Sequence, residues 1–260
     1  MRIKRLLLSG WLLIFSFGCS SALGCAFGQG AGSCTHILFI GNSYTYVNDL
    51  PGMFTQLAAA GGHAVETGME AQGGWTLSQH TGSSETLDKL NNSQWNYVVV
   101  QEQSQIPASM QARNQEMYPA ARVLVRKIRD IGATPILFVT WAHRDGWPEA
   151  GMQNYESMQF QIDNGYLGIA QELNVPESPV GFAWLEARRE NPQLNLWQED
   201  GSHPNEQGTY LAACVFYAVI FRQSPEGSSF TANLPKETAQ SLQKIAADTV
   251  LTNPQQWYLP

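Results

Sequence analysis

Short apolar runs alternate with segments of helical periodicity along most of this chain of 260 residues. An apolar run that ends in glycine or polar residues is typical of a buried strand, whereas apolar residues spaced three and four apart indicate a helix. Strands that alternate with helices favour a parallel sheet with helices on both faces. We therefore predict an α/β fold: one three-layer α/β/α domain with a mostly parallel sheet of about five strands. The predicted strands cover residues 36–40, 64–71, 97–100, 135–140 and 180–183.

Segments of helical spacing lie between these strands and follow the last of them. No internal repeat and no boundary of a second domain is visible, so we expect residues 36–260 to form one domain. In an open parallel sheet, functional groups collect beyond the carboxyl ends of the strands, which makes the polar residues after each strand the first site candidates. The predicted helices cover residues 50–60, 84–91, 118–131, 152–173, 205–221 and 236–251.

The N-terminus has the composition of a secretion signal. Residues 1–5 carry three positive charges, residues 6–17 are almost wholly apolar, and small residues continue to Gly24. The apolar run is short for a membrane span. We therefore expect residues 1–24 to be a signal peptide, residues 25–35 to be a linker, and the protein to be exported to the periplasm or the extracellular space.

The four cysteines leave two alternatives open near the N-terminus. Cys19 and Cys25 each follow a glycine, so a lipid anchor at one of them is an alternative to free release. Export also permits disulfides, and a Cys25–Cys34 bond would close a small loop. Cys214 lies in an apolar helical run and is expected to be a buried thiol.

The charge balance argues against a nucleic-acid partner. The whole chain has a formal net charge of −7, and removal of residues 1–24 takes away three positive charges and no negative one, which leaves −10. An acidic protein is poorly suited to bind a polyanion. The chain also lacks a CxxC pair and a His-Glu-x-x-His motif, so we predict no metal and no cofactor.

The first predicted strand ends in Gly41-Asn42-Ser43. A serine just beyond a strand can project its hydroxyl into a cleft, and its backbone N–H can face a developing oxyanion. The alternative is a plain turn in which Ser43 caps a helix. The nucleophile elbow of α/β-hydrolases is absent, because no second glycine follows the serine.

A second candidate motif precedes the helix predicted from residue 205. Asp200 and His203 are three residues apart on a tight turn, so the carboxylate can hold one imidazole nitrogen and leave the other free as a base. The alternative is a capping aspartate beside a surface histidine. Serine hydrolysis needs a nucleophile, a base and an orienting acid, and the sheet would bring Ser43 to the same edge as this pair.

These two motifs resemble the blocks of the SGNH (GDSL-like) hydrolases. Gly41-Asn42-Ser43 resembles their Gly-Asp-Ser block, with Asn42 in place of aspartate, and Asp200 to His203 resembles their Asp-x-x-His block. The resemblance runs over about residues 36–221 and implies the flavodoxin-like SGNH hydrolase fold. It also implies a catalytic triad of Ser43, His203 and Asp200.

The resemblance further implies an oxyanion hole. In the family, a glycine and an asparagine donate to the oxyanion beside the serine N–H. Gly74 matches the glycine, but the Gly-x-Asn-Asp block is here Gln101-Glu102-Gln103-Ser104. We assign the asparagine's role to Gln103, whose amide carries the same donor, and keep Gln101 as the alternate. Glutamines that only hold the loop are the competing interpretation, and Glu102 is expected to be a loop anchor.

The expected substrate follows from the resemblance as well. It implies ester substrates, with small O-acyl groups on carbohydrate or lipid, and Trp141 after the fourth strand is a candidate wall of the substrate pocket. His143 and Arg144 are weaker candidates for contact with an anionic group. The alternatives are a catalytically silent glycan-binding module on the same fold, and a thioesterase or peptidase with the same triad.

Overall fold

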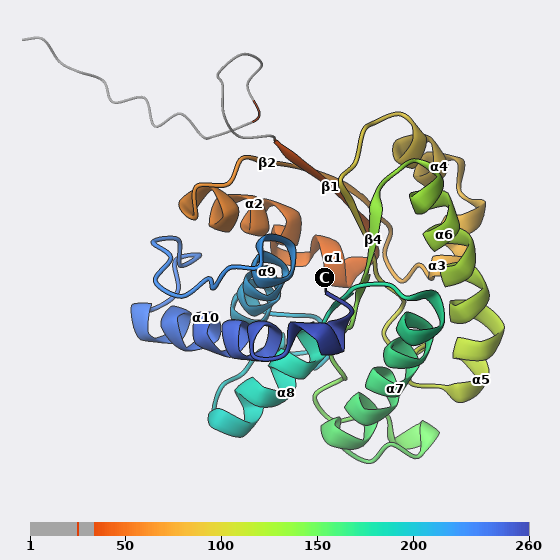
Figure 1. Cartoon of the computed structure of the whole chain (residues 1–260). Helices are drawn as coiled ribbons and strands as arrows, with labels where there is room; N and C mark the ends of the chain where they lie inside the picture. The colour runs from red at the N-terminus through yellow and green to blue at the C-terminus, as the bar shows by residue number, and fades with distance from the viewer. Residues whose placement is uncertain (1–24, 26–33, 260) are drawn as a thin grey trace, which may run out of the picture.

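Five parallel strands form the centre of the fold (Figure 1). The structure is a computed structural model, and it describes Cys25 and residues 34–259. The prediction of an α/β fold with a mostly parallel sheet of five strands is confirmed, because every strand pairs in parallel with its neighbours. The strands are β1 (Thr35–Gly41), β2 (Val65–Ala71), β3 (Tyr97–Val100), β4 (Thr134–Phe138) and β5 (Glu177–Ser178).

The strands lie in the order β2-β1-β3-β4-β5. The chain first moves from β1 outward to β2 and then returns past β1 to β3, so the winding direction reverses between β1 and β3. A crevice forms at the carboxyl ends of strands where the winding reverses. Ile40 lies opposite Val100 in the register, so residues 41–43 and 101–103 leave the sheet side by side.

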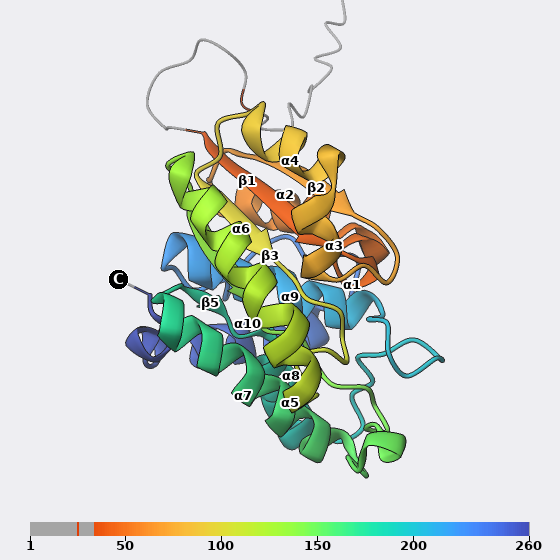
Figure 2. The ribbon, with the colours of Figure 1, turned by 90° about the vertical axis from the view of Figure 1, so that its right-hand side faces the viewer.

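Helices cover both faces of the sheet (Figures 1 and 2). One layer contains α2, α8, α9 and α10, and the other contains α3, α4, α6 and α7; the helices within each layer pack on one another. Short α-helical, 3-10 and π-helical turns connect these elements. The long helices are α2 (Leu50–Ala60), α3 (Leu77–Gly82), α4 (Ser84–Asn91), α6 (Tyr118–Asp130), α7 (Tyr155–Leu173), α8 (Val180–Glu190), α9 (Glu206–Phe221) and α10 (Lys236–Leu251).

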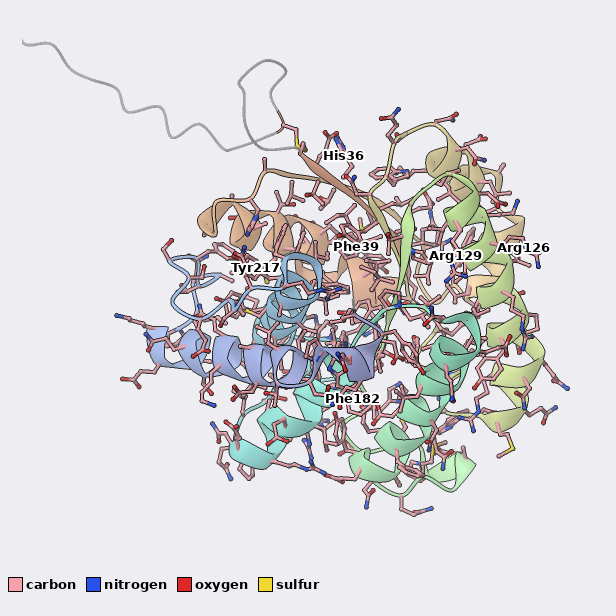
Figure 3. The ribbon with its side chains drawn as sticks, in the orientation of Figure 1. His36, Phe39, Arg126, Arg129, Phe182 and Tyr217 are labelled. Atoms are coloured by element: carbon pink, nitrogen blue, oxygen red, sulfur yellow. A yellow bond between two sulfur atoms is a disulfide. The ribbon has the colours of Figure 1, made fainter. Side chains whose placement is uncertain are left out.

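Helix α9 lies inside the molecule, where residues 208–220 are all buried. A helix that is apolar on all sides must be covered by other elements, and α9 contacts α2, α8 and α10. The ring of Phe39 from β1 meets that of Phe216 edge to face at 5.4 Å. Figure 3 shows Phe39 in the interior and Arg126 on the outer side of α6. Within the described residues, none of the helices is both long and apolar enough to span a bilayer.

The prediction of a strand at residues 180–183 is wrong. These residues begin helix α8, and the fifth strand is the two-residue β5 just before them. The buried positions Val180, Ala183, Trp184 and Ala187 follow the i, i+3, i+4, i+7 spacing of a helix face, which a short apolar run hides. The helical spacing over residues 180–187 therefore decides the structure of this segment, although residues 180–183 alone resemble a strand.

The other long helices, apart from α3, lie where the pattern predicts them to within a few residues. The predicted segments 50–60, 84–91 and 236–251 have the bounds of α2, α4 and α10. Helix α7 begins three residues later than expected, because the Asn154 side chain caps it by accepting from the Ser157 N–H. Helix α3, which begins with a Thr76–Gln79 capping box, was not predicted.

Cys25 and Cys34 form a disulfide, which is one of the alternatives that the sequence leaves open. Cys214 is a buried free thiol, as expected. A lipid thioether at Cys25 would use the same sulfur, so a lipid anchor there and this disulfide exclude each other. Cys19 and the whole predicted signal peptide, residues 1–24, lie outside the described residues.

Candidate active site

The residues that follow β1, β2 and β3 meet at the carboxyl edge of the sheet. A fourth segment, the loop before α9, closes over them. The cavity that they enclose has a volume of about 380 Å³. The short helix α1 (Ser43–Tyr46) begins at this edge. The residues that line the cavity are Asn42, Ser43, Tyr44, Tyr46, Gly73, Gly74, Gln103, Ser104, Ser202 and His203.

Ser43, His203 and Asp200 form one hydrogen-bonded chain. His203 Nε2 lies 2.9 Å from Ser43 Oγ, and His203 Nδ1 lies 2.5 Å from Asp200 Oδ2. The other carboxylate oxygen, Asp200 Oδ1, accepts from the backbone N–H groups of Ser202 at 2.9 Å and His203 at 3.0 Å. The structure thus brings together two motifs that are 160 residues apart.

The environment of Asp200 keeps its carboxylate ionised. Partial burial by itself raises the pKa of Asp200, but hydrogen bonds from the His203 ring and from the two backbone N–H groups outweigh that effect, so the pKa lies below its ordinary value. An ionised Asp200 fixes the proton of the imidazole on Nδ1 and leaves Nε2 as the acceptor that faces Ser43. The arrangement has the connectivity of an acid–base relay.

Ser43 is the first residue of the short helix α1, and two features place it there. Asn42 caps the helix, because its Oδ1 accepts from the Tyr44 N–H. Gly41 allows the close approach of β3, since a Cβ on Gly41 would lie 2.5 Å from both Gln101 Oε1 and Thr45 Oγ1. These contacts therefore fix the position of Ser43 just beyond the end of β1.

A buried pair of amides, Asn42 and Gln101, connects the nucleophile to its surroundings. Asn42 Nδ2 donates to the carbonyl of Trp75 at 2.8 Å, and Gln101 Nε2 donates to Asn42 Oδ1 at 3.0 Å. Gln101 Oε1 accepts from the Asn42 N–H and the Thr45 hydroxyl, both at 2.9 Å. An aspartate at position 42 would lose the donor to the Trp75 carbonyl. The two departures from the family blocks, Asn42 in place of aspartate and Gln101 in place of glycine, thus form one hydrogen-bonded pair.

Gln101 and Gln103 have different surroundings. Gln101 is fully buried, and its second amide hydrogen donates to the Glu102 carbonyl, so it has no donor left for the cavity. Gln103 lines the cavity, and its Oε1 accepts from the backbone N–H groups of Gln105 at 2.8 Å and Ile106 at 3.3 Å. Those bonds hold the amide so that Nε2 has only a long 3.3 Å contact with Ser104 Oγ.

Gly74 lines the same cavity with a φ of +73°, in the left-handed region that favours glycine. Its loop connects β2 to α3 and is tied to the nucleophile through the bond from Asn42 to Trp75. Ser43, Gly74 and Gln103 thus line one cavity.

Trp141 does not line the cavity, so the prediction that it forms a substrate wall is wrong. The indole is completely buried, stacked between Tyr44 at 4.5 Å and Trp184 at 4.2 Å. Its Nε1 donates to the Ser202 carbonyl at 3.0 Å. Trp141 therefore supports the loop of His203 from the core. Its aromatic surface packs against Tyr44 and Trp184 and is not part of the wall of the substrate pocket.

The hydroxyl groups of Tyr44, Ser104 and Ser202 on the wall of the cavity were not predicted as site groups, and His143 lies behind Ser104. The Tyr44 hydroxyl lies 2.7 Å from Ser202 Oγ, and Ser104 Oγ lies 3.1 Å from His143 Nε2. Burial lowers the pKa of His143, which favours a neutral ring beside Ser104. Arg144 does not line the cavity, and its backbone N–H donates to the Gly201 carbonyl at 2.7 Å. In the sequence, the only indication of Tyr44, Ser104 and Ser202 as site residues is their position after a strand or inside a motif.

The sequence matches no protein-family model and no curated protein. Among solved structures, the chain is similar to a DUF4886 family protein from Bacteroides uniformis, with 19% identity, a TM-score of 0.73, and coverage of 84% of this chain and 95% of that one. It is also similar to a proposed SGNH hydrolase from Slackia heliotrinireducens, with 26% identity, a TM-score of 0.60, and coverage of 71% and 97%.

A third similar structure is an acetylxylan esterase from Geobacillus stearothermophilus, with 18% identity and a TM-score of 0.56. The match covers 72% of this chain and 94% of that one. The β2-β1-β3-β4-β5 sheet and these similarities agree with the blocks found in the sequence. The chain therefore has the fold of the SGNH (GDSL-like) hydrolases, and the resemblance that its sequence motifs indicate is confirmed.

Proposed function

We propose that this protein is a serine esterase that cleaves its substrate through an acyl-enzyme on Ser43. One observation carries the proposal: the unbroken hydrogen-bonded chain from Ser43 Oγ through the His203 ring to Asp200. A hydroxyl becomes a useful nucleophile when a positioned base takes its proton, and a carboxylate on the far side of the imidazole stabilises the charge that results.

The first half-reaction forms the acyl-enzyme. Ser43 Oγ attacks the ester carbonyl carbon while its proton moves to His203 Nε2, and the carbonyl oxygen becomes an oxyanion. When the carbonyl forms again, the bond to the alcohol oxygen breaks, and His203 gives its proton to that oxygen. Asp200 holds the imidazolium throughout, because its Oδ2 is bonded to Nδ1.

The second half-reaction releases the acid. A water molecule attacks the acyl carbon while His203 takes one of its protons, and the tetrahedral intermediate then expels Ser43 Oγ, which recovers the proton from His203. In both halves, the proposed oxyanion donors are the backbone N–H groups of Ser43 and Gly74 and the Gln103 amide. Donors placed in advance need no rearrangement as charge develops, which is why they lower the barrier.

The size and polarity of the cavity favour a small acyl group on a polar alcohol. The volume is about 380 Å³, and hydroxyl, amide and imidazole groups line much of it. The similar structures include an acetylxylan esterase, whose substrate is an acetylated carbohydrate. We therefore extend the proposal to small O-acyl groups on carbohydrate, and a panel of acetylated sugars, thioesters and short peptides tests it against the thioesterase and peptidase alternatives.

The test of the mechanism combines one variant with one covalent probe. Ser43→Ala should abolish hydrolysis of a short-chain nitrophenyl ester, and a fluorophosphonate should label the wild type at Ser43. Ser78→Ala is the matched control, because Ser78 is an exposed serine of α3. Full activity of Ser43→Ala would refute the proposal, and a wild type that takes no label and turns over no ester would point to a silent binding module.

We also propose that the protein is exported after removal of residues 1–24. The Cys25–Cys34 disulfide supports this, because such bonds persist mainly in oxidising compartments. Mass spectrometry of the mature N-terminus from the native host tests it. An intact Met1 would contradict the proposal, and a lipid mass on Cys19 would support the anchored alternative.

A further inference from the structure

Glu102 lies under the cavity, between the two loops that carry the proposed Gly74 and Gln103 donors. Its side chain is completely buried, and its carboxyl group contacts the proposed site only through backbone N–H groups of the two loops among the described residues. A buried acidic side chain is costly unless its hydrogen bonds repay the cost, so the contacts of this carboxyl group indicate why it is there.

One oxygen of Glu102 bridges the two loops. Glu102 Oε1 accepts from the backbone N–H of Leu77 at 3.0 Å and from that of Gln103 at 2.7 Å. Leu77 begins α3, three residues after Gly74, and Gln103 carries the side-chain donor. The backbone N–H of Glu102 itself donates to the Tyr166 hydroxyl of α7 at 3.2 Å, which fixes the bridge to the core.

We infer that Glu102 is a positioning residue for the oxyanion hole: its Oε1 sets the distance between the Gly74 loop and the Gln103 loop by holding the Leu77 and Gln103 N–H groups. The inference rests on the proposed esterase function. Because donors must lie within a few tenths of an ångström of the oxyanion to be effective, a bridge between two separate loops should control turnover more than substrate binding.

The second oxygen makes the bridge sensitive to pH. Glu102 Oε2 is buried and has no hydrogen-bond partner among the described residues, and no Lys or Arg of that part forms an ion pair with Glu102. The titratable groups that influence it are the exposed Glu116 and Tyr166, whose hydroxyl accepts from the Glu102 backbone N–H. Burial, reinforced by the Glu116 charge, raises the pKa of Glu102 to about 7.

The sign of the pH effect follows from the position of this charge. Ionisation puts a negative charge one residue from Gln103, where the proposed mechanism develops a second negative charge. Like charges repel, so turnover should fall as the pH rises through about 7. A glutamine at this position keeps the oxygen that accepts both N–H groups but cannot ionise.

Two variants of the full chain separate the bridge from the charge. Glu102→Met removes the acceptor and should lower kcat for nitrophenyl acetate about 10- to 100-fold, with KM changed less than about threefold. Glu102→Gln should keep kcat within about threefold of the wild type at pH 6 and lack the fall above pH 7. Glu66→Gln, an exposed residue of β2, is the control and should change neither.

Each outcome decides the inference. A folded Glu102→Met with the kcat of the wild type overturns it, and so does a Glu102→Gln pH profile identical to that of the wild type. If Glu102→Met does not fold, the Glu102→Gln profile decides alone. Failure of the esterase proposal is distinct, because the wild type would then take no fluorophosphonate at Ser43 and Ser43→Ala would equal it in activity.

Discussion

The nucleophile side of the cavity is buried, whereas its acid–base side is open to solvent. Asn42 and Gln101, which hold Ser43, have exposed fractions of 3% and 0%. The His203 and Asp200 side chains are 33% and 47% exposed, and they lie on a loop. The nucleophile is therefore held by the core of the molecule, and the base is held mainly by its own loop.

The difference has a physical reason. The proposed reaction places a positive charge on His203, and a charge is costly to bury, so the acid–base pair benefits from contact with water. Ser43, in contrast, is held by two neutral amides, Asn42 and Gln101, whose hydrogen bonds are satisfied, and burial of such groups costs little free energy. We therefore expect substitutions on the buried side to reduce both stability and turnover, and those on the open side to reduce turnover alone.

His203→Ala should have the largest effect. Without the base, kcat for a short nitrophenyl ester should fall about 10⁴-fold or more. The thermal midpoint should change little, because the ring is partly exposed. His36→Ala, at the opposite end of β1, is the matched control and should keep full turnover. A drop in stability comparable to that of a core variant would contradict the open-side description.

Asn42→Asp comes next and should damage both properties. The carboxylate cannot donate to the Trp75 carbonyl and would be a buried charge, so we expect kcat to fall about 10- to 100-fold and the free energy of unfolding to fall by about 1–3 kcal/mol. Urea unfolding and steady-state kinetics measure both. Asn154→Asp is the control, because Asn154 caps α7 through its oxygen alone and aspartate caps equally well. Loss of turnover without loss of stability would contradict the expectation that substitutions on the buried side reduce both.

Trp141→Phe tests a deep anchor of the open side. The variant loses the Nε1 bond to the Ser202 carbonyl, so kcat should fall by about three- to tenfold and stability by about 1–2 kcal/mol. Trp257→Phe loses the same type of bond, to the Thr249 carbonyl near the C-terminus, and should cost stability without changing kcat. Equal kcat in both variants would mean that Trp141 does not support the His203 loop.

Glu177→Gln should leave turnover unchanged and alter only the pH dependence of stability. Both carboxylate oxygens of Glu177 are buried without a partner among the described residues, and burial raises its pKa to about 8. The folded state therefore favours the neutral acid, so wild-type stability should decline as the pH rises from about 4.5 to about 8. At pH 9 the variant should be more stable than the wild type by about 1–3 kcal/mol in urea unfolding, and nearly equal to it at pH 4. An unchanged pH dependence would contradict this assignment.

Much of the fold could be predicted because its signals are local. Strands β1 and β3 are apolar runs that end in polar residues, and α2, α4 and α10 show their face in one or two turns of spacing. The two motifs that carry Ser43 and His203 are each complete within a few residues. Their juxtaposition followed from one general rule about the carboxyl edge of parallel sheets.

The rest depends on partners that a local pattern does not contain. Strand β5 has two residues, too few for any periodicity, so α8 was mistaken for the last strand. The pairing of Asn42 with Gln101 joins residues 59 apart, each of which looks like an ordinary loop amide. An aromatic residue after a strand is compatible with a pocket wall or with the core, and only packing places Trp141 in the core.

The 160 residues between nucleophile and base also determine when the protein can become active. During synthesis Ser43 emerges early, whereas His203, the proposed base, emerges only in the last quarter of the chain. The position of the His203 loop then depends on the packing of α9 in the interior. In the proposed mechanism, a chain that ends before His203 lacks the base. Ester turnover, if measured as proposed, would therefore require the chain from β1 to α9.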